Sequence, residues 1–512
     1  MMSRSVSSLS RNARGWALGL SIVAILAIHI SYVLNGVYLL DALCLLLVPA
    51  FCLYLFALVI YPLEIAEVDV RRSYYLALFL LAVFLIISWI SKSRFAVSTL
   101  DDSYHNIKIL TTTIKNNFLI KTFFMTNGRV MFMDFAETLW GLFWRFTRWD
   151  FVIVLLQSLP LVLLWEGITD FLKKKDVRYP GLLALPVILS LQVLWSQQGS
   201  GYVDSTAGIF CGLVLLNVYM VLRYKDFQPS FSRIVGLAIL SVLCVMAKPH
   251  LFLVAILGIW VSLWSANRYL TGFLRSVVLL CAAVGVYHIL FFYFSLWSAG
   301  MSLLPYQGKF FTALASNNSG WTGLEGQYFT CHPLYYKLHA RHLDFRMFYL
   351  VLGWFFDYKY RRFITPDPFV GGNGVLWTYI VVPAMGVFLY HMVFHFKKTV
   401  GSFKQPHWLI AAVLAAYWLL SDGSIVSRFS LGFNILLMSW AFGYLWKALF
   451  VPWQEKNRMK AYLFLAAFII IAAGSYRLAI NGDMFDKKRE GNSLEVRYLN
   501  VMGHVQPRLN EL

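Results

Sequence analysis

Long apolar runs alternate with short polar segments along nearly the whole chain, from about Trp16 to Ile480. A helix that crosses a membrane needs roughly 20 predominantly apolar residues. On that basis the runs predict about thirteen such helices, at residues 16–34, 37–61, 73–90, 151–172, 181–195, 207–222, 234–247, 251–266, 273–297, 376–396, 408–420, 429–446 and 462–476. Membrane β-barrels instead alternate apolar and polar residues in short segments, so the pattern excludes that class.

The composition agrees with the pattern. The chain has 512 residues, of which 59% are hydrophobic and only 13% are charged, and its mean hydropathy is +0.64. An ordinary soluble domain carries about 25% charged residues, so a soluble enzyme, a disordered protein and a fibrous protein are excluded. We therefore predict an all-α polytopic membrane protein, with residues 1–512 forming one membrane domain and no cleaved signal peptide.

The distribution of Lys and Arg predicts how the helices are oriented. The net charge is +19, and the basic residues concentrate in alternate loops, which marks those loops as cytoplasmic. The short turns on the other side hold only Lys248 and Arg428. We attribute the positive charge to the cytoplasmic loops and expect no nucleic-acid partner. An odd number of helices places the tail, residues 479–512, outside. Its Lys487-Lys488-Arg489 run leaves a twelve-helix arrangement open.

Two long segments, residues 91–148 and 298–374, fall on the predicted outer face. In the first, residues 107–118 and 131–146 show apolar positions at helical spacing, and Thr126-Asn127-Gly128 marks a turn between them. We expect two helices that lie in the interface plane with their apolar faces in lipid. A helical hairpin packed on the protein is the alternative.

The adjacent carboxylates Asp101 and Asp102 are the most distinctive candidates for chemistry. They lie just outside the third predicted helix, where partial dehydration raises the pKa of a carboxyl group and suits it to take a proton from a hydroxyl. Tyr104 and His105 follow directly and are candidate substrate contacts. The alternative is structural, because Asp-Asp-Ser is also a favourable helix N-cap.

Cationic residues at the predicted outer ends of other helices suit an anionic group. Arg428 precedes a late helix and its planar guanidinium can hold a phosphate. Lys248 and His250 lie in the turn Ala247-Lys248-Pro249-His250. The alternatives are an Arg that reaches the interface and a purely structural turn. Asp204 begins another helix on this side and is expected to cap it.

Taken together, these features resemble the GT-C superfamily of integral-membrane glycosyltransferases. The resemblance is architectural over most of the chain. Its motif content is Asp101-Asp102, Lys248-Pro249 and Arg428-Phe429, which are similar to the acidic, Lys-containing and Arg-aromatic signatures of that group. One feature departs from the family pattern, because the acidic pair follows the third predicted helix, whereas in many members it follows the first. Two additional N-terminal helices account for the difference.

The resemblance implies an inverting transfer of a sugar from a polyprenyl-phosphate carrier to a hydroxyl of a glycan, lipid or protein acceptor. Asp101 or Asp102 would deprotonate the acceptor, and Lys248, His250 and Arg428 would stabilise the leaving phosphate. The donor needs no nucleotide. Some members use a divalent cation and others do not, and this remains open here. The implied location is a bacterial inner membrane with the site facing the periplasm.

Two other function classes remain open. An O-antigen polymerase or ligase would use arginines of the second long segment, where Arg341, Arg346, Arg361 and Arg362 are available. A solute transporter or lipid flippase would place ionisable groups within the helices, where Asp41 and Glu166 are the main candidates. Transporters also often show internal repeats, and we find none in this sequence.

Overall fold

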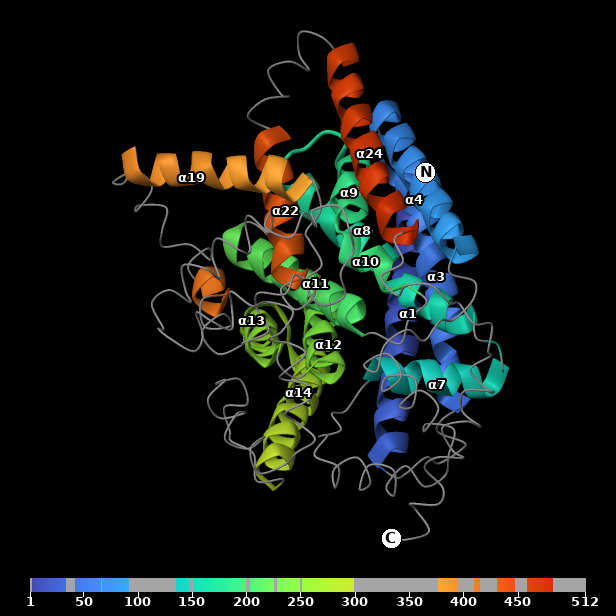
Figure 1. Ribbon diagram of the computed structural model, residues 1–512. Coiled ribbons are helices and arrows are strands. Elements are labelled where there is room, and N and C mark those ends of the chain that lie inside the picture. Colours follow the sequence, from blue (N-terminus) through green and yellow to red (C-terminus); the bar gives the residue numbers. More distant parts are fainter. Residues whose placement is uncertain are drawn as a thin grey trace, which may run out of the picture.

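The computed structural model describes residues 2–33, 42–65, 67–91, 135–147, 149, 151–198, 203–224, 228–248, 251–298, 376–394, 409–414, 431–446 and 458–481. Within these ranges every regular element is helical (Figure 1), which confirms the all-α prediction for this part of the chain. Among the described residues, five helical segments are long and apolar enough to cross a membrane: Leu43–Glu64, Val68–Ser91, Phe151–Lys174, Asp204–Arg223 and Phe252–Tyr269. Shorter apolar helical stretches accompany them.

The described helices follow one another in chain order from Met2 to Asn481. Their bounds are α1 Met2–Val33, η1 Leu43–Leu46, α3 Leu47–Ile60, η2 Tyr61–Glu64, α4 Val68–Ser91, α7 Phe135–Thr147, α8 Phe151–Lys174, α9 Pro180–Ser190, α10 Gln192–Ser196, α11 Asp204–Arg223, α12 Phe231–Ala247, α13 Phe252–Tyr269, α14 Gly272–Ser298, the π-helical turn η5 Trp377–Val381, α19 Val382–Phe394, α22 Leu431–Leu445 and α24 Arg458–Asn481.

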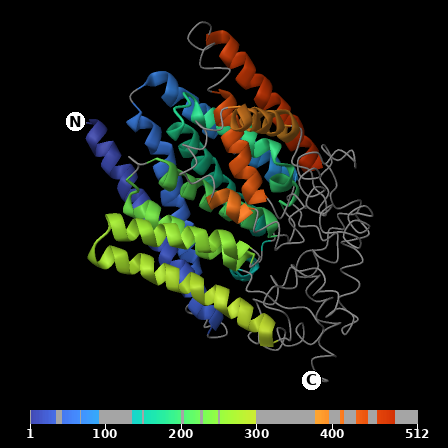
Figure 2. The same ribbon diagram turned by 90° about the vertical axis from the view of Figure 1, so that its left-hand side faces the viewer.

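Helix α11 forms the centre of the molecule. It packs against α8, α12, α13 and α22, and nearly all of its side chains are buried. The helices α12, α13 and α14 lie side by side at one flank (Figure 2). Peripheral helices instead expose large apolar side chains, such as Phe56 on α3, Phe79 on α4 and Leu290 on α14. Apolar exposure of this extent is what a lipid environment requires of the outer helices.

Small residues bring α11 and α22 close together. Gly208 and Gly212 are four residues apart on α11 and face Leu431 and Ile435 of α22. A Cβ atom added to Gly432 of α22 would lie 2.9 Å from the backbone nitrogen of Gly212 and would also meet Cys211. Small residues at this spacing allow membrane helices to pack backbone against backbone.

The bundle has two ends with different polar residues. At one end, where α8 and α11 finish and α4, α9 and α12 begin, lie Arg14, Glu166, Asp170, Lys173, Arg178 and Arg233, and we name this the basic end. At the other lie Trp89, Ser158, Gln197, Gln198, Asp204 and Lys248, and we name this the amide end. Lys248, which the sequence places on the outer side, thus lies at the end opposite to Lys173.

Helix α24, the last described helix, packs against α4 and α10 through Tyr476. The Tyr476 hydroxyl donates a hydrogen bond to the backbone carbonyl of Phe84 on α4, and the two rings pack edge to face. The Tyr476 ring also lies 4.6 Å, centroid to centroid, from that of Trp195 on α10. Both partners lie toward the amide end, so α24 runs from the basic end to the amide end.

Two predicted membrane helices are irregular. Residues 181–195 are predicted as one helix, but α9 ends at Ser190 and Leu191 has a non-helical backbone (φ −78°, ψ 88°) before α10 begins. The break leaves carbonyl groups of α9 without helical partners, and the Trp195 indole N–H bonds to one of them, that of Ile188, at 3.0 Å. The described part of the predicted helix at 376–396 ends at Phe394 and consists of η5 and α19, and α19 lies crosswise to α22 in Figure 1.

Helix α7 covers most of the second predicted interfacial helix and lies crosswise to α1 (Figure 1). Its Trp140 and Trp144 side chains are each 1% exposed and belong to the same apolar core as α8. The prediction that this aromatic face lies in lipid is therefore wrong for these two residues, because protein buries them. The first predicted interfacial helix, residues 107–118, lies outside the described residues, as does nearly all of the second long segment.

Candidate functional site

Lys248 is the predicted site residue around which a candidate site can be built. The other predicted site residues lie outside the described part of the chain: Asp101, Asp102, Tyr104, His105, His250 and Arg428. Lys248 directly follows α12 at the amide end, with an extended backbone that turns the chain toward α13. The geometry around its ammonium group decides which chemistry this end of the bundle can support.

Lys248 pairs with Asp204. The distance from Lys248 Nζ to Asp204 Oδ1 is 2.6 Å, and the side chain of Asp204 is only 2% exposed, whereas that of Lys248 is 20% exposed. The sequence suggested only that Asp204 caps its helix, but Val203 occupies the N-cap and Asp204 is the first residue of α11. Its carboxylate instead links the start of α11 to the end of α12, so two candidates treated separately in the sequence form one unit.

Gln197, just after α10, holds the carboxylate from the other side. Its Nε2 donates to Asp204 Oδ2 at 3.4 Å, and its Oε1 accepts the backbone N–H of Ser205 at 2.8 Å. That N–H belongs to the first turn of α11, where backbone donors lack helical partners. Gln197 therefore fixes both the Asp204 side chain and the start of the helix that carries it.

Two buried hydroxyl groups follow Asp204 on α11. Ser205 Oγ and Thr206 Oγ1 are buried, and neither has a hydrogen-bond partner among the described residues. A buried hydroxyl without a partner costs free energy, on the order of 1–3 kcal/mol. Such a group is often completed by water or a bound ligand. Together with Asp204, Gln197 and Lys248, these hydroxyls make a mixed set of donors and acceptors.

A second buried hydrogen-bond network lies next to this site. Ser158 of α8 accepts a hydrogen bond from Trp89 Nε1 at 2.8 Å, and its hydroxyl lies 3.0 Å from Gln198 Oε1. Gln198 Nε2 in turn donates to the backbone carbonyl of Gln157 at 3.2 Å. The network joins α4, α8 and the segment after α10, so it keeps Gln197 and its neighbours in a fixed position relative to the bundle.

The burial of the pair sets its electrostatic character. Removing two charges from water is costly unless they are closely paired and hydrogen-bonded, and here the carboxylate has both the ammonium group and the Gln197 amide. An ammonium group has three N–H donors. Because Lys248 is the more exposed partner, it is the member of the pair that a bound anion can reach.

Glu137 adds a second buried carboxylate near this end. It lies on α7, which packs against α8 and α12, and its side chain is fully buried. Glu137 falls within the second predicted interfacial helix, residues 131–146, and was not among the predicted site residues. The predictions from the sequence also missed Gln197 and Gln198, for which the signal was an amide pair directly before Gly199-Ser200-Gly201. No group of three or more metal-ligating side chains occurs within the described ranges.

No family model, curated protein or solved structure matches this chain. Function is therefore inferred from the residues themselves.

Proposed function

We propose that the protein is an integral-membrane glycosyltransferase similar to the GT-C superfamily, with about thirteen membrane-spanning helices. It moves a sugar from a polyprenyl-phosphate carrier to an acceptor hydroxyl on the outer face of a bacterial inner membrane, for the synthesis or modification of a cell-envelope polysaccharide or another glycan. The amide end faces the periplasm in this proposal, because the basic end carries the Lys and Arg excess that is typical of cytoplasmic loops.

The observation that carries the proposal is the Asp204–Lys248 pair at the amide end. A sugar bound through phosphate leaves negative charge on the phosphate oxygens when its anomeric carbon–oxygen bond breaks. Lys248, oriented by Asp204, donates hydrogen bonds to that phosphate, and such charge stabilisation is often the largest catalytic contribution. Asp204 acts through Lys248 and is a positioning residue. Arg428 and His250 are the sequence candidates that complete the phosphate site.

The reaction balances without a nucleotide. The acceptor oxygen forms a bond to the anomeric carbon on the face opposite the phosphate, so the configuration inverts. The acceptor proton passes to Asp101 or Asp102, and the polyprenyl phosphate leaves with the electron pair of the broken bond. The buried Ser205 and Thr206 hydroxyls and the Gln197 amide supply donors and acceptors of the kind that bind sugar hydroxyls.

The experiment that tests the proposal compares wild-type protein with Asp101→Asn, Asp102→Asn and Lys248→Arg. Purified protein is assayed for sugar transfer from a polyprenyl-phosphate-sugar extract, and surface glycans are analysed in cells that carry each variant. We expect at least one Asp variant to fold, to bind the donor and to lose transfer. Lys248→Arg keeps the charge and should retain partial activity.

Lys174→Gln at the basic end is the matched control, because it removes a Lys charge far from Lys248. It should leave transfer unchanged. If both Asp variants keep full activity while Arg341 and Arg346 variants lose it, the protein is a polymerase or ligase and the proposal fails.

A further inference from the structure

A cavity of about 100 Å³ lies at the basic end, between η2, the start of α4 and the last turns of α8. Polar groups that line it include Tyr61, Ser73, Thr169, Lys173 and Arg178, together with the carboxylates Glu166 and Asp170. The volume is sufficient for several water molecules and therefore for one phosphate group. The sugar-transfer chemistry proposed for the amide end makes no use of this cavity.

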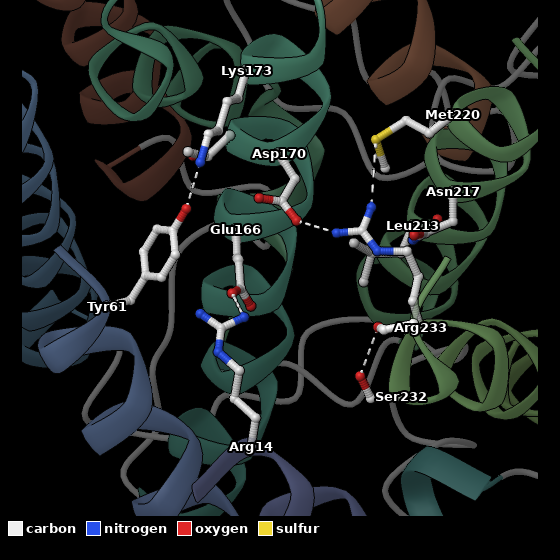
Figure 3. A network of polar contacts seen from close by, with 12 residues as sticks. Arg14, Tyr61, Glu166, Asp170, Lys173, Leu213, Asn217, Met220, Ser232 and Arg233 are labelled. Carbon is white, nitrogen blue, oxygen red and sulfur yellow. Dashed lines mark hydrogen bonds and ion pairs between the residues drawn. The ribbon is translucent and has the colours of Figure 1, made fainter. Parts of the chain in front are cut away.

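The two carboxylates that line the cavity are already neutralised. Glu166 Oε1 lies 2.5 Å from Arg14 Nη1, and Glu166 also accepts a hydrogen bond from the Tyr54 hydroxyl. Asp170 Oδ2 lies 2.5 Å from Arg233 Nη2. Figure 3 shows the two guanidinium groups reaching α8 from different helices. The carboxylates therefore do not present uncompensated negative charge to an anion in the cavity.

Among the charged residues that line the cavity, Lys173 has no carboxylate partner within the described part of the chain. Its Nζ donates to the Tyr61 hydroxyl at 2.6 Å (Figure 3). An ammonium group has three N–H donors, so two of them have no acceptor in that part of the chain. The hydroxyl hydrogen of Tyr61 also has none there. These donors line one side of the cavity.

Arg178 adds a second cation to the lining. Its partner is Glu67, with Nη2 2.9 Å from Oε1, and the two side chains are 31% and 55% exposed. Solvent screens an exposed pair of this kind, so Glu67 only partly offsets the positive charge that Arg178 contributes to the cavity lining. A guanidinium, an ammonium and a phenol hydroxyl together match the oxygens of a phosphate group.

We propose that this cavity binds the phosphate headgroup of an anionic phospholipid from the leaflet around the basic end. A lipid fits better than free phosphate because the cavity is bordered by η2 and α4, where Leu63 and Val68 expose apolar side chains for acyl chains to cover. Basic pockets between membrane helices are known to select such headgroups. The site is independent of the proposed sugar transfer.

Native mass spectrometry of the detergent-solubilised full chain tests the site. The wild type, Lys173→Gln, Lys173→Arg, Tyr61→Phe and the control Lys174→Gln are each mixed with phosphatidylglycerol or with phosphatidylcholine of the same acyl chains. Lys173→Gln should retain about fivefold less phosphatidylglycerol than wild type. Tyr61→Phe should lose less, and Lys173→Arg and Lys174→Gln should bind like the wild type. Melting temperatures of all variants check that they are folded.

Three results would overturn the proposal. Equal retention of phosphatidylglycerol by Lys173→Gln and Lys174→Gln would show that Lys173 is not a ligand. Equal binding of phosphatidylcholine by the wild type would show that the phosphate site does not select an anionic lipid. Saturable binding of inorganic phosphate, with loss of lipid adducts on its addition, would assign the cavity to a soluble phosphate. Because no sugar donor is present, failure of the glycosyltransferase assignment would not affect the outcome.

Discussion

The two ends of the bundle hold charged residues among apolar helices in different ways. At the amide end one acid and one base are paired within a buried set of amides, and Asp204 is 2% exposed. At the basic end several ion pairs lie side by side, and their members are mostly between one sixth and one half exposed. Burial, rather than the number of charges, distinguishes them.

This difference has an energetic consequence. The Arg178–Glu67 pair gains little, because Glu67 is 55% exposed, water solvates it and salt screens the attraction. Loss of one member of a buried pair leaves the other charge without compensation in a medium that cannot solvate it. We therefore expect loss of Lys248 at the amide end to be severe and loss of either member of the Arg178–Glu67 pair at the basic end to be mild. Multiple weak pairs suit a surface that meets lipid headgroups, and one rigid pair suits a site that must hold a group in place.

The largest effect is expected for Lys248→Met. It leaves the Asp204 carboxylate buried without its counter-ion and should lower the free energy of unfolding by about 3–5 kcal/mol. Asp204→Asn should cost less, because Lys248 is partly exposed and its ammonium can reach water. Reversible unfolding in mixed detergent and SDS micelles measures both. The double variant Lys248→Met with Asp204→Leu should recover much of the loss, and no recovery would contradict the buried-pair explanation.

A packing change near the amide end is expected to be the next largest. Gly432→Ala adds a Cβ that would meet Cys211 and would lie 2.9 Å from the backbone nitrogen of Gly212, so α11 and α22 must separate. The overpacking should cost about 1–3 kcal/mol. Gly236→Ala on α12 is the control, since a Cβ there has no neighbour within 4 Å, and it should not destabilise. Equal unfolding free energies for the two variants would show that the close approach is unimportant.

Ser158→Ala tests the hydrogen-bond network of Trp89, Ser158 and Gln198. The substitution removes the acceptor of the Trp89 indole N–H and the hydroxyl that donates to Gln198 Oε1. The indole N–H and the amide oxygen then each lose a hydrogen bond. The expected loss is about 1–2 kcal/mol of unfolding free energy, measured by unfolding in mixed detergent and SDS micelles. Ser241→Ala on α12 serves as a control, because the Ser241 hydroxyl donates to the Leu237 carbonyl of its own helix. It should have a smaller effect.

The sequence was sufficient for some of these features and not for others. Apolar runs predicted the helices because a membrane-spanning helix has a minimum length that composition reveals. Lys248 and Asp204 were each noticed, but their pairing depends on how α11 and α12 pack, which local patterns do not encode. The aromatic face of α7 was assigned to lipid because lipid and a protein core select the same residues. Gly208-x-x-x-Gly212 is a pattern typical of close helix packing, but our predictions from the sequence did not use it.

The smallest effect is expected at the basic end, for Arg178→Gln. Its partner Glu67 is more than half exposed, so the pair should contribute about 0–1 kcal/mol. The contribution should also disappear at high ionic strength, because exposed charges are screened within about a Debye length. Unfolding free energies at low and high salt measure this directly, with Glu67→Gln as the reciprocal variant. A salt-independent loss as large as that of Lys248→Met would remove the distinction between the two ends, since it would mean that exposure does not govern the strength of these pairs.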